Sequence, residues 1–245
     1  MQHIFNLVPA WEHGVDAQRT IDFLFTQEWP IFSQRHQISY TIPLTRYDEE
    51  PPGGGGAEAG GLGDIFLNYR YQALNDHNGD LIALAPRISL IFPSGDAEKG
   101  LGNGKLGYQI NFPISKTLDR WAMHFNAGLT KVSGVTTGVD PQIPFEGRDL
   151  DGYNIGASVI YFLRPNFHLM LEQSNLWTDE LTFEGEQDNK SLCFISPGFR
   201  WAPFTHEDTQ WVLGLGLPVG VSADAPDIGI FFYMSFEHRF IKTDD

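Results

Sequence analysis

The chain has 245 residues, 42% of them apolar, and a formal net charge of -15; its mean hydropathy is -0.22. This length fits a single domain. A membrane-spanning helix needs about 18 consecutive apolar residues, and no apolar run approaches that length, so a helical membrane protein is excluded. The acidic balance argues against a nucleic-acid-binding protein, because contacts with phosphate need clustered Lys and Arg side chains.

Apolar and polar residues alternate along most of the chain, and this period of two predicts β-strands. Eleven strands are expected at 18–29, 33–44, 64–73, 80–93, 105–114, 121–129, 151–163, 167–175, 191–202, 209–217 and 228–240, and 2–8 would supply a twelfth. The last strand illustrates the pattern. Phe232, Met234 and Phe236 share one face, whereas Ser235 and Glu237 lie on the other.

These strands predict an all-β fold, a closed antiparallel transmembrane β-barrel of about 12 strands in one domain, because closure pairs every backbone group within a membrane. Residues 1–17 are expected to be a first strand or a plug, 18–240 the barrel, and 241–245 a C-terminal tail. An exported barrel needs a signal peptide, which we expect to be removed before Met1. A soluble β-sandwich or lipocalin-like binder explains the alternation equally well.

The connections favour the membrane barrel. The expected periplasmic connections are short, at 30–33, 74–79, 115–119, 164–166 and 203–208. The expected external connections are longer, at 45–60, 94–103, 130–150, 176–190 and 218–227. This asymmetry is typical of bacterial outer-membrane barrels.

The tryptophans agree with that topology, since their amphipathic rings prefer the membrane interfaces. Four lie at the expected periplasmic strand ends: Trp29, Trp121, Trp201 and Trp211. Trp177, and with it Trp11, lies near the external rim. The sequence therefore predicts two aromatic girdles.

Charged and polar residues on the opposite strand faces are expected to line the lumen, because charge is costly against lipid. The candidates are Asp22, Glu28, Asp64, Arg70, Arg87, Lys105, His124, Asn126, His168, Glu172, Arg200, Glu237 and Arg239. One interpretation is a polar pathway whose charges select solutes. The other is a mutually satisfied network that fills a narrow barrel.

Other chemistry finds little support. His124, His168 and Glu172 invite a hydrolase hypothesis, but no Gly-x-Ser-x-Gly motif is present. The glycines of 100–105 lack the spacing and the following Ser or Thr of a P-loop. No Cys or His cluster has metal-ligand spacing, and Cys193 has no cysteine partner. The Gly-rich segment 49–61 reads as a flexible external loop, which could fold inward as a gate.

The residues Gly61-Leu62-Gly63-Asp64, Phe92-Pro93-Ser94-Gly95-Asp96 and Gly100-Leu101-Gly102-Asn103-Gly104, with Pro86, Trp121 and Asn126-Ala127-Gly128, carry a resemblance. Over 61–128 the chain resembles the outer-membrane β-barrel family of transporters associated with the phenol-degradation meta pathway. The resemblance implies passive uptake of small molecules, hydrophobic or aromatic ones among them. It supplies no catalytic residues.

We therefore predict a bacterial outer-membrane channel without a cofactor, metal or enzyme activity. Its expected partners are outer-membrane lipids and lipopolysaccharide, a small-molecule solute and, transiently, the barrel assembly machinery, which captures a last strand like the one ending at Phe240. Two further alternatives remain open. One is a non-conducting surface barrel that acts through loops 130–150 and 176–190, and the other is a lipid-modifying barrel enzyme.

Overall fold

The computed structural model describes residues 2–11, 17–50, 58–76, 79–137, 139, 142–182, 184–206 and 209–238. The longer strands are β1 (Gln2–Trp11), β2 (Ala17–Ile31), β3 (Ser33–Glu50), β4 (Glu58–Leu62), β5 (Ile65–Tyr71), β7 (Arg87–Phe92), β8 (Gly107–Thr117), β9 (Trp121–Val135), β10 (Arg148–Arg164), β11 (Phe167–Leu181), β12 (Gln187–His206), β13 (Thr209–Gly216) and β16 (Phe231–His238). Two-residue strands are β6 (Ala83–Leu84), β14 (Val219–Gly220) and β15 (Ile228–Gly229), and Ala97–Lys99 form the 3₁₀ helix η2. Among the described residues, none lies in a helix long and apolar enough to cross a bilayer.

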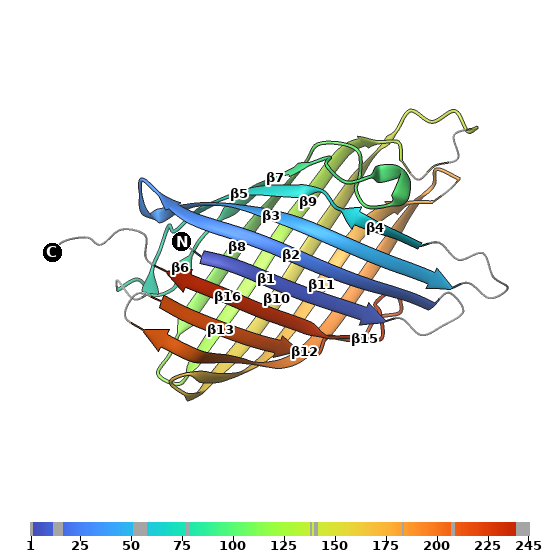
Figure 1. Cartoon of the computed structure of the whole chain (residues 1–245). Helices are drawn as coiled ribbons and strands as arrows, with labels where there is room; N and C mark the ends of the chain where they lie inside the picture. The colour runs from blue at the N-terminus through green and yellow to red at the C-terminus, as the bar shows by residue number, and fades with distance from the viewer. Residues whose placement is uncertain are drawn as a thin grey trace.

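All of these strands belong to one antiparallel sheet, so the expected all-β antiparallel architecture is confirmed. β1 pairs with β2, β2 with β3, β3 with β5 and β5 with β7. From β7 to β13 each long strand pairs with the next. β13 then pairs with β16, and β16 pairs with β1. The sheet is curled, and its first and last strands lie side by side (Figure 1).

Residues 2–11, for which the sequence left a strand or a plug open, form β1 between β2 and β16. The tail 241–245, Arg239 and Phe240 lie outside the described residues.

The two faces of the sheet differ in polarity. On β9, the outward Trp121, Met123 and Phe125 are 44–47% exposed. On the inner face the buried side chains include polar ones, namely Ser39, Asn68, Ser89, Asn111 and Ser235. Large apolar side chains on the outer face, around an interior that holds several buried polar side chains, are typical of a membrane barrel.

Prolines lie at two breaks between strands, and one of them divides an expected strand. The segment 80–93 divides into β6 and β7 because Pro86 has no backbone N–H to donate to a ladder. Its carbonyl still accepts a hydrogen bond from Tyr71 N at 3.0 Å. Pro218 likewise lies between β13 and β14, and its carbonyl accepts from Gly229 N at 2.8 Å.

Three predicted external loops are shorter than expected, because the strands continue into them. β3 runs to Glu50 within 45–60, and β9 and β10 extend into 130–150. β11 and β12 occupy most of 176–190, because β11 ends at Leu181 and β12 begins at Gln187.

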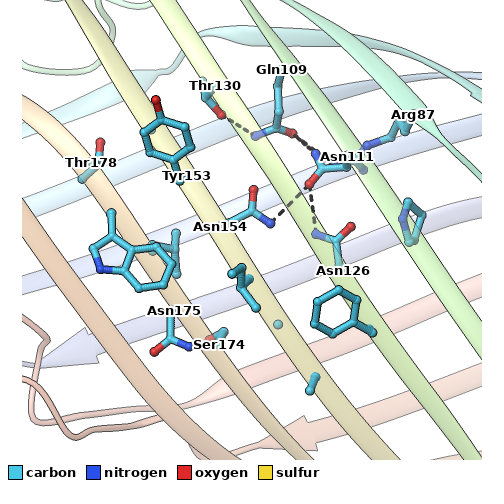
Figure 2. A pocket seen from close by; sticks show the side chains of 18 of the residues that line it. Arg87, Gln109, Asn111, Asn126, Thr130, Tyr153, Asn154, Ser174, Asn175 and Thr178 are labelled. Atoms are coloured by element: carbon cyan, nitrogen blue, oxygen red, sulfur yellow. Dashed lines mark hydrogen bonds between the residues drawn. The ribbon is translucent and has the colours of Figure 1, made fainter.

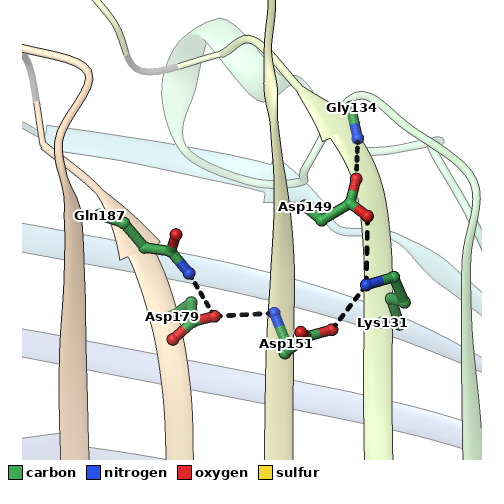
Figure 3. A network of polar contacts seen from close by, with 6 residues as sticks. All are labelled: Lys131, Gly134, Asp149, Asp151, Asp179 and Gln187. Carbon is green, nitrogen blue, oxygen red and sulfur yellow. Dashed lines mark hydrogen bonds and ion pairs between the residues drawn. The ribbon is translucent and has the colours of Figure 1, made fainter.

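A polar network holds these strand extensions together (Figure 3). Lys131 Nζ lies 3.1 Å from both Asp149 Oδ2 and Asp151 Oδ1. The backbone N–H of Asp151 donates to Asp179 Oδ2 at 3.0 Å, which joins β10 to β11. Gly134 N donates to Asp149 Oδ1 at 3.0 Å. This network is charged and half-exposed. The apolar side chains of the outer face therefore do not continue into this end of the strands.

Candidate functional site: a polar cavity inside the sheet

A cavity of about 560 Å³ runs along the inner face of β8 to β11. Its lining extends from Asn103, in the loop before β8, to Ser115 and His124 toward the other end of β8 and β9. Side chains from four neighbouring strands point into it because inward positions alternate with outward ones along each strand. The cavity therefore lies on the inner side of the sheet.

An amide cluster centred on Asn111 forms one wall of the cavity (Figure 2). Asn111 Oδ1 accepts hydrogen bonds from Asn126 Nδ2 at 2.9 Å and from Asn154 Nδ2 at 3.3 Å. Asn111 Nδ2 donates to Gln109 Oε1 at 2.8 Å, and Gln109 Nε2 donates to Thr130 Oγ1 at 3.0 Å. These neutral groups both donate and accept, so they can exchange hydrogen bonds with a polar solute or water.

Gly128 makes room for this cluster. It is the register partner of both Asn111 and Asn154. A Cβ at this position would lie 2.2 Å from Asn111 Oδ1 and 2.6 Å from Asn154 Oδ1. Since real Cβ contacts are never that short, any side chain here would push the two amides apart.

A second row of polar side chains crosses the same wall. Ser115, His124, Ser158 and Glu172 are successive register partners on β8, β9, β10 and β11, and all four line the cavity. Ser115 Oγ lies 2.7 Å from His124 Nδ1.

This pair places a hydroxyl beside a potential base, but a catalytic triad also needs a group that orients the base. No hydrogen bond joins the Glu172 carboxylate to the imidazole in the described part of the chain, and Ser158 lies between them in the register. The row therefore resembles a polar lining more than a hydrolase site.

Two arginines lie opposite each other beside the amide cluster. Arg70 on β5 and Arg87 on β7 are register partners, two residues beyond the buried pair Asn68 and Ser89. Arg70 Nη2 donates to Gln37 Oε1, and Arg87 Nη2 donates to Gln109 Oε1 at 3.2 Å.

The predicted lumen residues divide into three groups. Arg87, His124, Asn126 and Glu172 line the cavity, and Arg70 lies beside Arg87. His168 is the register partner of Arg200 and packs against the Phe162 ring at 4.8 Å. Glu237 lies on β16 opposite Gln210. A lumen role for these residues stays a prediction.

The expected start of a strand at Lys105 is wrong, and a lumen role for this residue stays a prediction. The expected strand 105–114 begins only at Gly107, so Lys105 lies in the preceding loop and is exposed. The apolar residue Leu106 made the alternation look one step longer than the strand is, and Leu106 itself is 58% exposed.

Asp64 holds a loop in place, and a lumen role for it stays a prediction. It is 7% exposed and precedes β5, which begins at Ile65. Its Oδ1 accepts from Gly95 N at 3.0 Å and its Oδ2 from Asn103 N at 2.9 Å. The three motifs that carry the family resemblance therefore meet at one carboxylate, and Gly102 packs against it without space for a Cβ.

Three polar residues outside the predicted set, Asn154, Ser158 and Ser174, also line the cavity. They alternate with Tyr153, Ile155 and other apolar residues of 151–163 and 167–175. Extending the inside–outside assignment along these two strands would have found them. The predicted lumen residues are mostly charged, whereas these three residues are neutral.

The tryptophans stand where the topology expected them. Trp29, Trp121, Trp201 and Trp211 lie toward the strand ends on the side where β1 begins, and Trp177 lies toward the opposite end of β11 (Figure 1). Trp121 contacts Tyr161 at a centroid distance of 4.6 Å. A girdle role stays a prediction. The side chain of Trp11 lies outside the described part of the structure.

No protein-family model matches the chain, and neither does any curated protein sequence. Solved structures do match, and the fold that they share is the outer-membrane β-barrel. An outer-membrane channel from Pseudomonas putida F1 aligns with a TM-score of 0.71 at 14% identity, over 97% of this chain and 94% of that chain.

Two other solved barrels are similar at lower scores. The transport unit of the autotransporter AIDA-I from Escherichia coli aligns with a TM-score of 0.56 at 8% identity, over 98% of this chain and 89% of that one. The NanC porin aligns with a TM-score of 0.51 at 8% identity, over 96% and 100%. The all-β antiparallel sheet is thus similar in fold to solved outer-membrane barrels.

Proposed function

We propose that the chain is a closed barrel of 12 strands in the bacterial outer membrane, and that its polar lumen lets small solutes cross passively. The strands of the ring are β1, β2, β3, β5, β7 to β13 and β16. The pairing of β16 with β1 supports closure, and the apolar outer face supports insertion into lipid. Outer-membrane lipid, lipopolysaccharide and the barrel assembly machinery are the partners that this location implies.

The observation that carries the proposal is the polar cavity enclosed by a sheet whose outer face is apolar. In a filled structural barrel, side chains would occupy the interior volume. Here about 560 Å³ is left between the amide cluster and the row of Ser115, His124 and Glu172. The family resemblance implies hydrophobic or aromatic solutes, and the lining favours those with at least one polar group.

Liposome swelling in arabinose tests the proposal. Ser158→Trp places a large ring on the cavity side of β10, and we expect it to lower the wild-type swelling rate to nearly that of empty liposomes. Val159→Trp is the matched control, because Val159 is the next residue along, faces outward and is 39% exposed. It should keep the wild-type rate.

Both variants must first show the heat-dependent gel shift of a folded barrel. Wild-type protein that folds but gives the empty-liposome rate would contradict passive transport and favour a non-conducting surface barrel.

A further inference from the structure

We propose that Arg70 and Arg87 form a binding site for the carboxylate of a small organic anion within the lumen. This inference rests on the proposed channel function and names the class of solute that the channel prefers. It starts from an arrangement that is unfavourable by itself, namely two like charges directly opposite each other on neighbouring strands.

The protein does little to compensate these charges. The two guanidinium groups donate hydrogen bonds to the neutral amides of Gln37 and Gln109. No carboxylate lies within ion-pair distance of either arginine among the described residues. Glu28 on β2 is the acidic group whose charge reaches Arg87, and it acts at longer range.

Arg87 also keeps unused donors. A guanidinium carries five N–H groups, and one hydrogen bond from its Nη2 is present. Its Nε is buried without a hydrogen-bond partner in the described structure. Asn111, its register partner on β8, donates to Gln109 and supplies no negative charge.

The position of the pair makes it accessible to a solute. Arg87 lines the cavity next to the amide cluster, and Arg70 adjoins it on β5. A planar carboxylate matches the fork of a guanidinium with two parallel hydrogen bonds. Its charge would offset the repulsion between the two arginines, so binding and local stability are coupled.

Benzoate is a suitable probe, with benzyl alcohol as its neutral counterpart. We expect calorimetric titration of the detergent-solubilised protein to detect benzoate and not benzyl alcohol. The double variant Arg70→Gln/Arg87→Gln should weaken benzoate binding by roughly tenfold or more. Arg148→Gln, at the exposed start of β10, is the matched control and should bind benzoate like the wild type.

A reversal potential across a KCl gradient gives a second reading. We expect the wild type to prefer anions and the double Gln variant to shift toward cations. Arg70→Lys/Arg87→Lys keeps the charge but loses the planar fork, so it should keep the ion preference and bind benzoate less tightly. This conservative variant also guards against a folding defect of the Gln variant.

The outcomes separate the two proposals. Benzoate binding that depends on the arginines, in a protein that passes no current, would overturn the channel and support the site. Conduction without anion preference, together with benzoate binding that the Gln variant leaves unchanged or with no binding at all, would overturn the site and support the channel.

Discussion

Gly128→Ala is expected to destabilise the folded barrel by roughly 2–4 kcal/mol, because the new Cβ overpacks the inner wall and breaks hydrogen bonds that are buried there. The Cβ would meet Asn111 Oδ1 at 2.2 Å and the backbone oxygen of Ile110 at 2.7 Å. The amide can rotate away only by losing its bonds to Asn126 and Asn154, and the backbone oxygen cannot move without disturbing the β8–β9 ladder. Denaturant unfolding in detergent micelles, followed by tryptophan fluorescence, measures the change.

Gly156→Ala is the matched control for this substitution. Gly156 lies on the neighbouring strand β10, opposite Asn126, and a Cβ there would lie 3.6 Å from the backbone oxygen of Gln173. This is an ordinary van der Waals contact, so its stability should stay within about 1 kcal/mol of the wild type. Equal effects of the two substitutions would show that the amide cluster does not need the space at Gly128.

Asp64→Ala is expected to release the loop 93–106 from the barrel rim. The substitution removes the acceptor for two backbone N–H groups, those of Gly95 and Asn103, and both bonds are charge-assisted. Bonds of this kind contribute about 1.5–3 kcal/mol each, so the loss of even one of them should accelerate hydrogen exchange in this loop by roughly tenfold to a hundredfold. Mass spectrometry of the peptide that covers the loop measures the rate.

Asp96→Ala is the control for the loop. Asp96 lies in the same segment and pairs with Lys99 at 2.7 Å, but both side chains are largely exposed. Exposed ion pairs contribute little, so exchange should remain close to the wild-type rate. If Asp64→Ala also left the exchange unchanged, the remaining contacts, such as Tyr47 Oη to Lys99 O at 2.8 Å, would hold the loop without the carboxylate.

The sequence predicted the strands well where lipid-facing and inward residues alternate strictly, as around Phe125 and Asn126 on β9. It underestimated the strands at the end far from the termini. There the outer face carries Lys131, Asp151 and Asp179, and the alternation of apolar residues disappears. The strands continue there because ion pairs and backbone hydrogen bonds between strands stabilise them. These contacts join residues of different strands, so the alternation within one strand does not predict them.

The site was predicted in part for a related reason. Alternation predicts which face of the sheet a side chain lies on. It placed His124, Asn126 and Arg87 on the inner face, where the cavity lies. It does not tell which side chains bond one another. The role of Asp64 depends on Gly95 and Asn103, 31 and 39 residues away along the chain, and a loop of that kind has no periodic pattern to read.

Single-channel recording of the refolded wild-type protein in a planar lipid bilayer tests the central claim most directly. A closed barrel with a continuous polar lumen predicts discrete, reproducible current steps at each insertion. Insertion of folded protein with no current above that of the bare bilayer would contradict the channel, and would make the polar interior a sealed core.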